Sequence, residues 1–236
     1  MHAPITGIRR LSSKSDVFEK AISDANIEEC VKFLQALQLP KRYRKSSNKT
    51  SFAVLIPFCR DRDSRPCLLV QQRSLKMRRD RGMICFPGGV QDDADSRDHV
   101  TTALRETEEE IGVNASQVRV FGTAAPFQTR NDMGMLYPVV GFVDLKFTDG
   151  VDPFKLSVDE VEKVHLVPLQ NLVREENWRY TRWRGGLALP VYRDEVFNDK
   201  DVPRIWGITA MMIHFVMNAI LPHEYKFSFD IIKLPK

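Results

Sequence analysis

The stretch from Cys85 to Val113 constrains this chain more than any other part of it. It reads CFPGGVQDDADSRDHVTTALRETEEEIGV, which is a glycine-rich turn, an acidic loop and a helical segment that ends in carboxylates. Because glycine has no Cβ, the turn Pro87–Gly89 lets the backbone come close to a ligand or to a neighbouring helix. Gly112 stands where a helix typically ends in a left-handed cap. The stretch therefore predicts a strand, a loop and a short helix that hold acidic side chains against a backbone turn.

We expect the helix of this stretch to run from Arg97 to Ile111. At about 3.6 residues per turn, Val100, Leu104 and Thr107 fall on the same side as Ile111. Apolar residues at this spacing are typical of the face that a helix packs against a core. We therefore predict that this face is buried.

Three carboxylates share a different face of the same helix. Glu106, Glu109 and Glu110 stand at i, i+3 and i+4, where like charges repel. They also lie near the helix C-terminus, where the helix dipole disfavours anions. A hard divalent cation with oxygen ligands would offset both effects, whereas the alternative is a solvated acidic helix end. We predict that these three residues bind Mg²⁺ or Mn²⁺, which would activate a water molecule for attack on a diphosphate.

The acidic helix end resembles a known family signature. Residues 105–113 read RETEEEIGV, and the Nudix hydrolases carry the box G-x(5)-E-x(7)-R-E-U-x-E-E-x-G-U, in which U is aliphatic. In this half of the box only Thr107 departs, because it is partly polar at a U position. Arg105 stands four residues before Glu109, so we expect it to orient that carboxylate by a bidentate contact.

The first half of the box departs more. Between Gly89 and Arg105 lie 15 residues, two more than in the pattern, and the first Glu of the pattern falls on Arg97. That Glu is generally structural in the family. If the extra residues belong to the loop, Asp95 or Asp98 takes its place as the partner of Arg105.

A second signature precedes the glycines. Residues 69–89 read LVQQRSLKMRRDRGMICFPGG, which resembles the extended signature of the coenzyme A diphosphatases among the Nudix hydrolases, L-L-T-x-T-[SA]-x(3)-R-x(3)-G-x(3)-F-P-G-G. Leu69, Ser74, Arg78, Gly82 and residues 86–89 match. Val70, Gln71 and Arg73 do not.

The resemblance implies an α/β fold, namely the Nudix α/β/α sandwich on a mixed β-sheet, here with an extra N-terminal helix. It implies a metal-dependent diphosphatase that cleaves coenzyme A or its thioesters into 3′,5′-ADP and (acyl-)4′-phosphopantetheine. One alternative is a Nudix hydrolase of other nucleoside diphosphate derivatives, such as ADP-ribose or a dinucleotide. Another is a non-catalytic Nudix module that binds metabolites or RNA, against which the intact Glu106, Glu109 and Glu110 argue.

The predicted site divides by role. The catalytic residues are Glu106, Glu109, Arg105 and Glu160, with either Glu106 or Glu160 as the base and ordinary surface charge as the alternative for Glu160. For substrate binding we predict Arg73, Ser74, Arg78, Gly88 and Gly89, because an arginine-rich loop beside the metal suits a substrate with a diphosphate and a 3′-phosphate. A turn hydroxyl is the alternative for Ser74.

The rest of the chain reads as one catalytic domain with additions at both ends. We expect residues 1–45 to be a tail and a helix, residues 46–222 the Nudix domain and residues 223–236 a C-terminal tail. Apolar spacing predicts the first helix over residues 16–39, ended by Pro40, and a last, buried helix over residues 207–221. Strands are predicted at residues 51–59, 67–72, 118–125, 135–145, 161–167, 187–192 and 204–206, and a short helix at 169–175.

The net charge and the apolar runs limit the kinds of partner that this chain is expected to bind. The net charge of +4 suits a polyanionic small-molecule substrate but is too small to predict nucleic acid binding. The most apolar run, Ile208–Leu221, is too short for a membrane span and contains His214 and Asn218. We therefore expect no nucleic acid and no membrane partner, and a monomer or homodimer.

The chain ends and the cysteines bear on where in the cell the protein is found. Residues 1–15 contain Arg9, Arg10 and Lys14 and no acid, which is typical of a mitochondrial transit peptide, although a plain tail is the alternative. The C-terminal residues KLPK differ from the peroxisomal SKL signal. Four cysteines without C-x-x-C spacing indicate buried reduced thiols. We expect an intracellular protein, mitochondrial or otherwise cytoplasmic.

Overall fold

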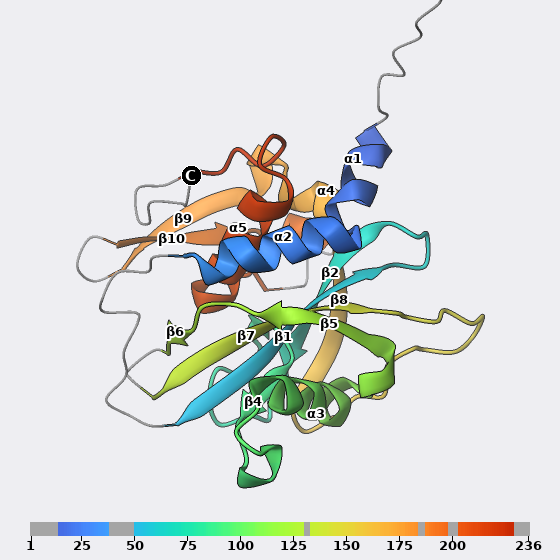
Figure 1. The fold of residues 1–236 in the computed structure, drawn as a ribbon, viewed down its shortest axis with the longest axis vertical. Coiled ribbons are helices and arrows are strands. Elements are labelled where there is room, and N and C mark those ends of the chain that lie inside the picture. Colours follow the sequence, from blue (N-terminus) through green and yellow to red (C-terminus); the bar gives the residue numbers. More distant parts are fainter. Residues whose placement is uncertain (1–13, 38–49, 130–132, 184–186, 198–202, 229–236) are drawn as a thin grey trace, which may run out of the picture.

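The computed structural model describes residues 14–37, 50–129, 133–183, 187–197 and 203–228. A mixed β-sheet forms the middle layer, with helix α3 on one face and helices α2 and α5 on the other (Figure 1). The helices are α1 (Lys14–Ala21), α2 (Asp24–Gln35), α3 (His99–Ile111), α4 (Leu169–Leu172) and α5 (Gly207–Ile220). The predicted α/β/α sandwich on a mixed sheet is confirmed.

The main sheet is organised around two long parallel strands. Strand β1 (Ser51–Arg60) pairs in parallel with β7 (Met135–Val143), and the other pairings are antiparallel. The order is β3-β2-β1-β7-β5, with β8 on β2, β4 on β1 and β6 on β7. The remaining strands of this sheet are β2 (Pro66–Arg73), β3 (Ile84–Cys85), β4 (Gly88–Val90), β5 (Val118–Thr123), β6 (Phe127–Gln128) and β8 (Val161–Pro168).

Strand β1 is buried on both faces, and its alternating side chains divide the core. Val54, Ile56 and Phe58 pack in the larger cluster with α2 and α5, whereas Ala53 and Leu55 pack in the cluster under α3. Successive side chains of a strand point to opposite faces, so a continuous apolar run serves both layers. The strand therefore fixes the position of helix α3 relative to the rest of the core.

Helix α3 differs in detail from the prediction. It begins after Asp98, whose carboxylate accepts hydrogen bonds from two backbone N–H groups, and it ends at Gly112, which has the expected positive φ of 73°. Thr107 and Ile111 are buried as predicted, but Val100 and Leu104 are only half-buried. Ala103 takes a core position instead, because it faces the sheet directly.

The predicted helix over residues 16–39 is two helices. The Ser23 hydroxyl donates to the backbone carbonyl of Lys20 at 2.8 Å, and Ser23 itself is extended, so the chain turns between α1 and α2. Serine often bonds local backbone in this way and interrupts a helix. Helix α2 ends at Gln35, and Pro40 lies outside the described residues.

The C-terminal part of the domain contains a second sheet. Strand β9 (Trp178–Trp183), which the sequence did not predict, pairs with β10 (Leu187–Tyr192). The strand predicted at residues 204–206 is reduced to a bridge between Ile205 and Tyr192. After α5, in the segment expected to be a tail, Tyr225 and Phe227 are buried against the same cluster.

Two further expectations concern the interior and the membrane. Cys30, Cys59 and Cys67 are buried free thiols and Cys85 is half-buried. Among the described residues, no helix combines the length and apolarity that crossing a bilayer requires.

Candidate active site

The glycine turn lies directly against the acidic face of α3. Strand β4 pairs with β1 and leads into the loop before the helix. A Cβ on Gly88, whose φ is 146°, would overlap the carbonyl oxygen of Ala53, and a Cβ on Gly89 would overlap the carboxylate of Glu106. Gly88 therefore needs glycine, because its positive φ and its approach to the β1 backbone leave no room for a side chain. At Gly89 a side chain would instead displace the Glu106 carboxylate.

Glu110 is a buried carboxylate with two neutral hydrogen-bond donors. The Gln71 side-chain Nε2 donates to its Oε2 at 2.7 Å, and the backbone N–H of Gly88 donates to the same oxygen at 2.8 Å. Burial raises the pKa of Glu110 to about 7, although these donors lower it. A bound cation would favour the charged form of this group.

Glu106 lies one turn earlier on α3, beside Gly89. Burial raises its pKa above the usual range, while the hydrogen bond from Arg105 acts in the opposite direction. The negative charges of Glu109 and Glu160 also raise this pKa. The site thus concentrates negative charge that nearby side chains only partly offset.

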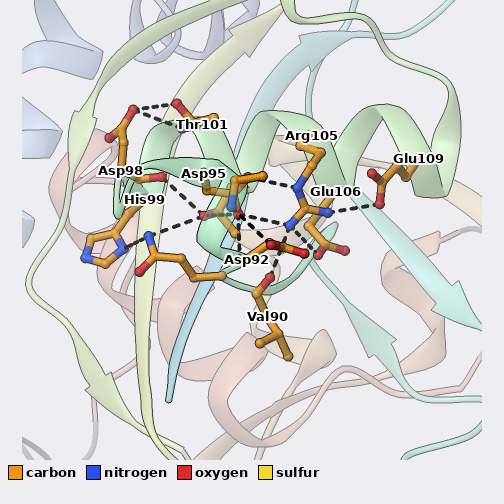
Figure 2. Close-up of polar contacts among 12 residues, drawn as sticks. Val90, Asp92, Asp95, Asp98, His99, Thr101, Arg105, Glu106 and Glu109 are labelled. Carbon is orange, nitrogen blue, oxygen red and sulfur yellow. Dashed lines mark hydrogen bonds and ion pairs between the residues drawn. The ribbon is translucent and has the colours of Figure 1, made fainter. Parts of the chain in front are cut away.

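Arg105 connects the acidic helix to the loop before it (Figure 2). Its guanidinium donates to the Asp95 carboxylate through Nε at 2.9 Å and through Nη2 at 3.1 Å. It also donates to Glu106 at 2.9 Å, to Glu109 at 3.0 Å and to the carbonyl oxygen of Val90 at 3.1 Å. The bidentate contact that we expected with Glu109 is therefore made with Asp95, and Glu109 receives a single hydrogen bond.

Asp95 replaces the structural Glu of the family box. Besides Arg105, it accepts hydrogen bonds from the Thr102 hydroxyl at 2.8 Å and from the backbone N–H of Asp92 at 2.9 Å. The hydrogen bond from Arg105 is the main reason that its pKa lies well below its usual range. The two extra residues fit into a 3₁₀ turn, Asp93–Asp95. Asp98, the other candidate, caps α3 instead.

The carboxylates that remain fit a divalent cation by their chemistry. Carboxylate oxygens are ligands that Mg²⁺ and Mn²⁺ prefer, and Glu106 and Glu110 both face the Gly88–Gly89 backbone. Glu109 is half-exposed and held by Arg105. Among the residues that the structure describes, no three acidic, histidine or cysteine side chains form a preassembled metal cluster. The fit therefore rests on Glu106 and Glu110.

A basic loop, residues 74–82, connects β2 to β3 and so precedes the glycine turn. Two backbone hydrogen bonds, from Arg73 N–H to Met83 and from Gly82 N–H to Arg73, join its two ends at 2.9 Å. Between them lie Lys76, Arg78, Arg79 and Arg81, all exposed. Cations are thus carried on a short loop that leads directly into β3 and the glycine turn.

Of the other predicted site residues, Ser74 and Arg78 lie on this loop, and Glu160 lies on the turn before β8. Ser74 is buried, and its backbone N–H donates to the Glu160 carbonyl oxygen at 2.8 Å, which ties the loop to the turn before β8. Its hydroxyl donates to the carbonyl oxygen of Val158 at 3.4 Å, as a turn hydroxyl would. The Glu160 side chain is exposed on that turn, and Arg78 is exposed on the loop.

Sequence reasoning missed Gln71. It stands on β2 two residues after Leu69, which packs in the cluster under α3, so strand alternation directs Gln71 to the same face. A polar residue at a position where the alternation calls for an apolar one was the available signal. Gln71 is fully buried and contacts Glu110.

Comparison with known proteins identifies the family. The family model described as the NUDIX domain matches residues 49–184. The chain therefore belongs to the Nudix hydrolases, and it is an enzyme of that family.

Three relatives extend this likeness. Mitochondrial coenzyme A diphosphatase NUDT8 of Mus musculus is 32% identical over 201 residues, which cover 82% of this chain and 89% of the relative. An uncharacterized Nudix hydrolase, NudL of Escherichia coli, is 37% identical over 77% of this chain and 89% of its own length. Peroxisomal coenzyme A diphosphatase NUDT7 of Mus musculus is 42% identical over 52% of this chain and 48% of its own length.

Proposed function

We propose that this Nudix hydrolase cleaves the diphosphate of coenzyme A or its thioesters, yielding 3′,5′-ADP and (acyl-)4′-phosphopantetheine. The observation that carries the proposal is the basic loop between Arg73 and Gly82, which is closed at its base by two hydrogen bonds and leads into β3 and the glycine turn. A diphosphate needs charge neutralisation at the bond that breaks, and a 3′-phosphate needs cations further away. Two relatives, one mitochondrial and one peroxisomal, are both named coenzyme A diphosphatases, which supports the same substrate for this chain.

We assign the cation to Glu106 and Glu110, with Glu109 as the third predicted ligand. When bound, Mg²⁺ or Mn²⁺ neutralises charge on the phosphoryl oxygens and lowers the pKa of water. Arg105 holds Glu106 and Glu109 in place through its hydrogen bonds. The close approach of Gly88 and Gly89 leaves their backbone beside the carboxylates, where the diphosphate would lie.

Two carboxylates compete for the part of general base. Glu160 is exposed on the turn before β8, and its charge contributes to the raised pKa of Glu106. Glu106 accepts a hydrogen bond from the Arg105 guanidinium at 2.9 Å, which leaves its carboxylate less free to take a proton from water. We therefore favour the carboxylate of Glu160 as the base, with Glu106 as the alternative.

The metal assignment is tested by charge-neutral replacements. Glu109→Gln and Glu110→Gln are assayed for Mg²⁺-dependent release of 3′,5′-ADP from coenzyme A, with product identification by mass. We expect strong loss with Glu110→Gln. If both variants retained wild-type rates at limiting Mg²⁺, the metal assignment would be wrong.

The substrate assignment is tested on the basic loop. Arg78→Gln should raise the KM for coenzyme A about tenfold, because a charge-assisted phosphate contact is worth roughly 1.5 kcal/mol or more. The KM for 3′-dephospho-coenzyme A should change little. Arg62→Gln, an exposed arginine in the β1–β2 turn, is the matched control. Equal effects on both substrates would favour a Nudix hydrolase of other nucleoside diphosphates.

We propose a mitochondrial location, which the mitochondrial relative supports. Imaging of the full chain fused at its C-terminus to a fluorescent protein tests this. Exclusion from mitochondria would contradict it.

A further inference from the structure

Two buried polar atoms on strand β2 have no hydrogen-bond partner among the described residues. They are Oε1 of Gln71 and Nε of Arg73. Both residues stand where the coenzyme A diphosphatase signature has threonine, so this chain has longer polar side chains at these two positions. Burying a polar atom unpaired costs about 1–3 kcal/mol, so these side chains require an explanation beyond packing.

The Gln71 side chain reaches Glu110. It is fully buried, its Nε2 donates to Glu110 Oε2 at 2.7 Å, and the same Nε2 lies 3.8 Å from the sulfur of Cys85. The Gly88 N–H occupies the same carboxylate oxygen at 2.8 Å. Within the described part of the chain, both hydrogen bonds to the Glu110 carboxylate therefore go to Oε2, and Oε1 receives none.

Arg73, two residues further along β2, is the other residue whose buried atom makes no hydrogen bond within the described part of the chain. The Gln71 amide itself lies behind a carboxylate that faces the glycine turn. Partners of this kind orient ligating carboxylates in metal sites, and losing one typically costs about 10–100-fold in metal affinity or activity.

We propose that Gln71 is a positioning residue that holds Glu110 by Oε2 and thereby presents Oε1 to the divalent cation. The amide has no contact with solvent, so it acts through Glu110 and not on the substrate. Threonine, the signature residue, is shorter by two heavy atoms and would leave this hydrogen bond unmade. The inference rests on the proposed function, because it presupposes that Glu110 binds the cation.

The test is direct binding of Mn²⁺, measured by the electron paramagnetic resonance signal of free Mn²⁺. The variants are Gln71→Met, which keeps the side-chain length without the donor, and Gln71→Thr, which introduces the signature residue. Gln72→Met is the matched control, because Gln72 is the next residue on the same strand and points to the opposite face. Glu110→Gln is the reference for loss of the ligand itself.

We expect both Gln71 variants to raise the Kd for Mn²⁺ about tenfold or more, with Gln72→Met unchanged. Saturating Mn²⁺ should restore most of the kcat, while the KM for coenzyme A changes by less than about twofold, a pattern that general damage to the fold would not give. If Gln71→Met did not fold, Gln71→Asn, which shortens the amide, would be judged by the same Kd.

The outcomes separate this inference from the proposed function. If the wild type binds Mn²⁺ and Glu110→Gln weakens binding, but the Gln71 variants bind as the wild type does, only the positioning role is overturned. If Glu110→Gln binds Mn²⁺ as tightly as the wild type, the metal assignment fails and the positioning role falls with it.

Discussion

Two buried carboxylates, Asp95 in the loop before helix α3 and Glu110 on the helix itself, have pKa values shifted in opposite directions. Asp95 is 1% exposed and Glu110 is 4% exposed, so burial alone does not distinguish them. Asp95 accepts four hydrogen bonds, two of them from the Arg105 guanidinium. Glu110 accepts two, both from neutral donors. The pKa of Asp95 therefore lies well below its usual range, whereas that of Glu110 rises to about 7.

The difference shows which acid is available for chemistry. The carboxylate of Asp95 is fully used by contacts that fix the loop to the helix, so its function is structural. The carboxylate of Glu110 is desolvated and has fewer donors than its charge requires. A buried anion in that state gains most from a cation. The sequence signature alone does not distinguish these two acids, because both lie in the same loop and helix.

The largest effect should come from Glu110→Gln. Loss of this proposed metal ligand would remove several kcal/mol of transition-state stabilisation, so we expect the rate to fall about 1,000-fold or more. The unfolding free energy at pH 8 should stay the same or rise, because a buried charge is removed. Steady-state kinetics and urea unfolding in metal-free buffer measure the two quantities. If the variant lost stability together with activity, Glu110 would have a structural role like that of Asp95.

Asp95→Asn should show the opposite pattern. Neutralising this carboxylate leaves the Arg105 guanidinium poorly paired, which should cost about 3 kcal/mol of stability. For a chain of this size that corresponds to a Tm lower by roughly 6–12 °C. The control is Asp93→Asn, an exposed acid in the same 3₁₀ turn. A Tm unchanged in both variants would show that the Arg105 contacts do not hold the loop.

The pH dependence of stability should separate the two acids as well. Between the ordinary pKa of 4.5 and the raised value of about 7, folded Glu110 binds a proton that the unfolded chain has released. The stability of the wild type relative to Glu110→Gln should therefore fall as the pH rises from 5 to 8, by on the order of 2 kcal/mol. Urea unfolding in the presence of a chelator measures it. A difference independent of pH would contradict the raised pKa.

For Asp95 the sign is reversed. Its pKa is depressed in the folded state, so its stabilising contribution is present above its unfolded value of 3.8 and disappears as the pH falls below that value. Asp95→Asn should therefore lose its disadvantage relative to the wild type in strongly acidic buffer.

The sequence predicted the parts of this site that depend on regular spacing. Glu106, Glu109 and Glu110 follow from helical periodicity, and the long strands β1 and β2 that support them follow from their apolar runs. The course of the loop could not be predicted, because Ser96 and Arg97 both adopt left-handed backbone, with φ of 52° and 59°. Arginine rarely does so, and only the packed loop reveals that Asp95 rather than Asp98 meets Arg105.

Other misses have similar tertiary causes. Strand β9 has the sequence WRYTRW, which is too polar to be recognised as a strand without its pairing partner β10. Gln71 was visible as a polar residue in an apolar strand, but the length of its side chain and the position of Glu110 had to be known together. The amide illustrates how a site extends beyond its signature residues.

The smallest effect should come from Asp98→Ala, which tests the other candidate for the missing Glu. Asp98 accepts hydrogen bonds from the backbone N–H groups of Val100 and Thr101 at 3.2 Å, so it acts as a helix cap. Losing a cap costs about 1 kcal/mol, or roughly 2–4 °C in Tm for a chain of this size. Asp98→Asn should retain most of that stability, since asparagine also caps well, whereas Asp95→Asn should not. Thermal unfolding of the three variants measures the contrast. If Asp98→Asn were as unstable as Asp95→Asn, the charge of Asp98 would also be needed, and the loop would depend on both acids.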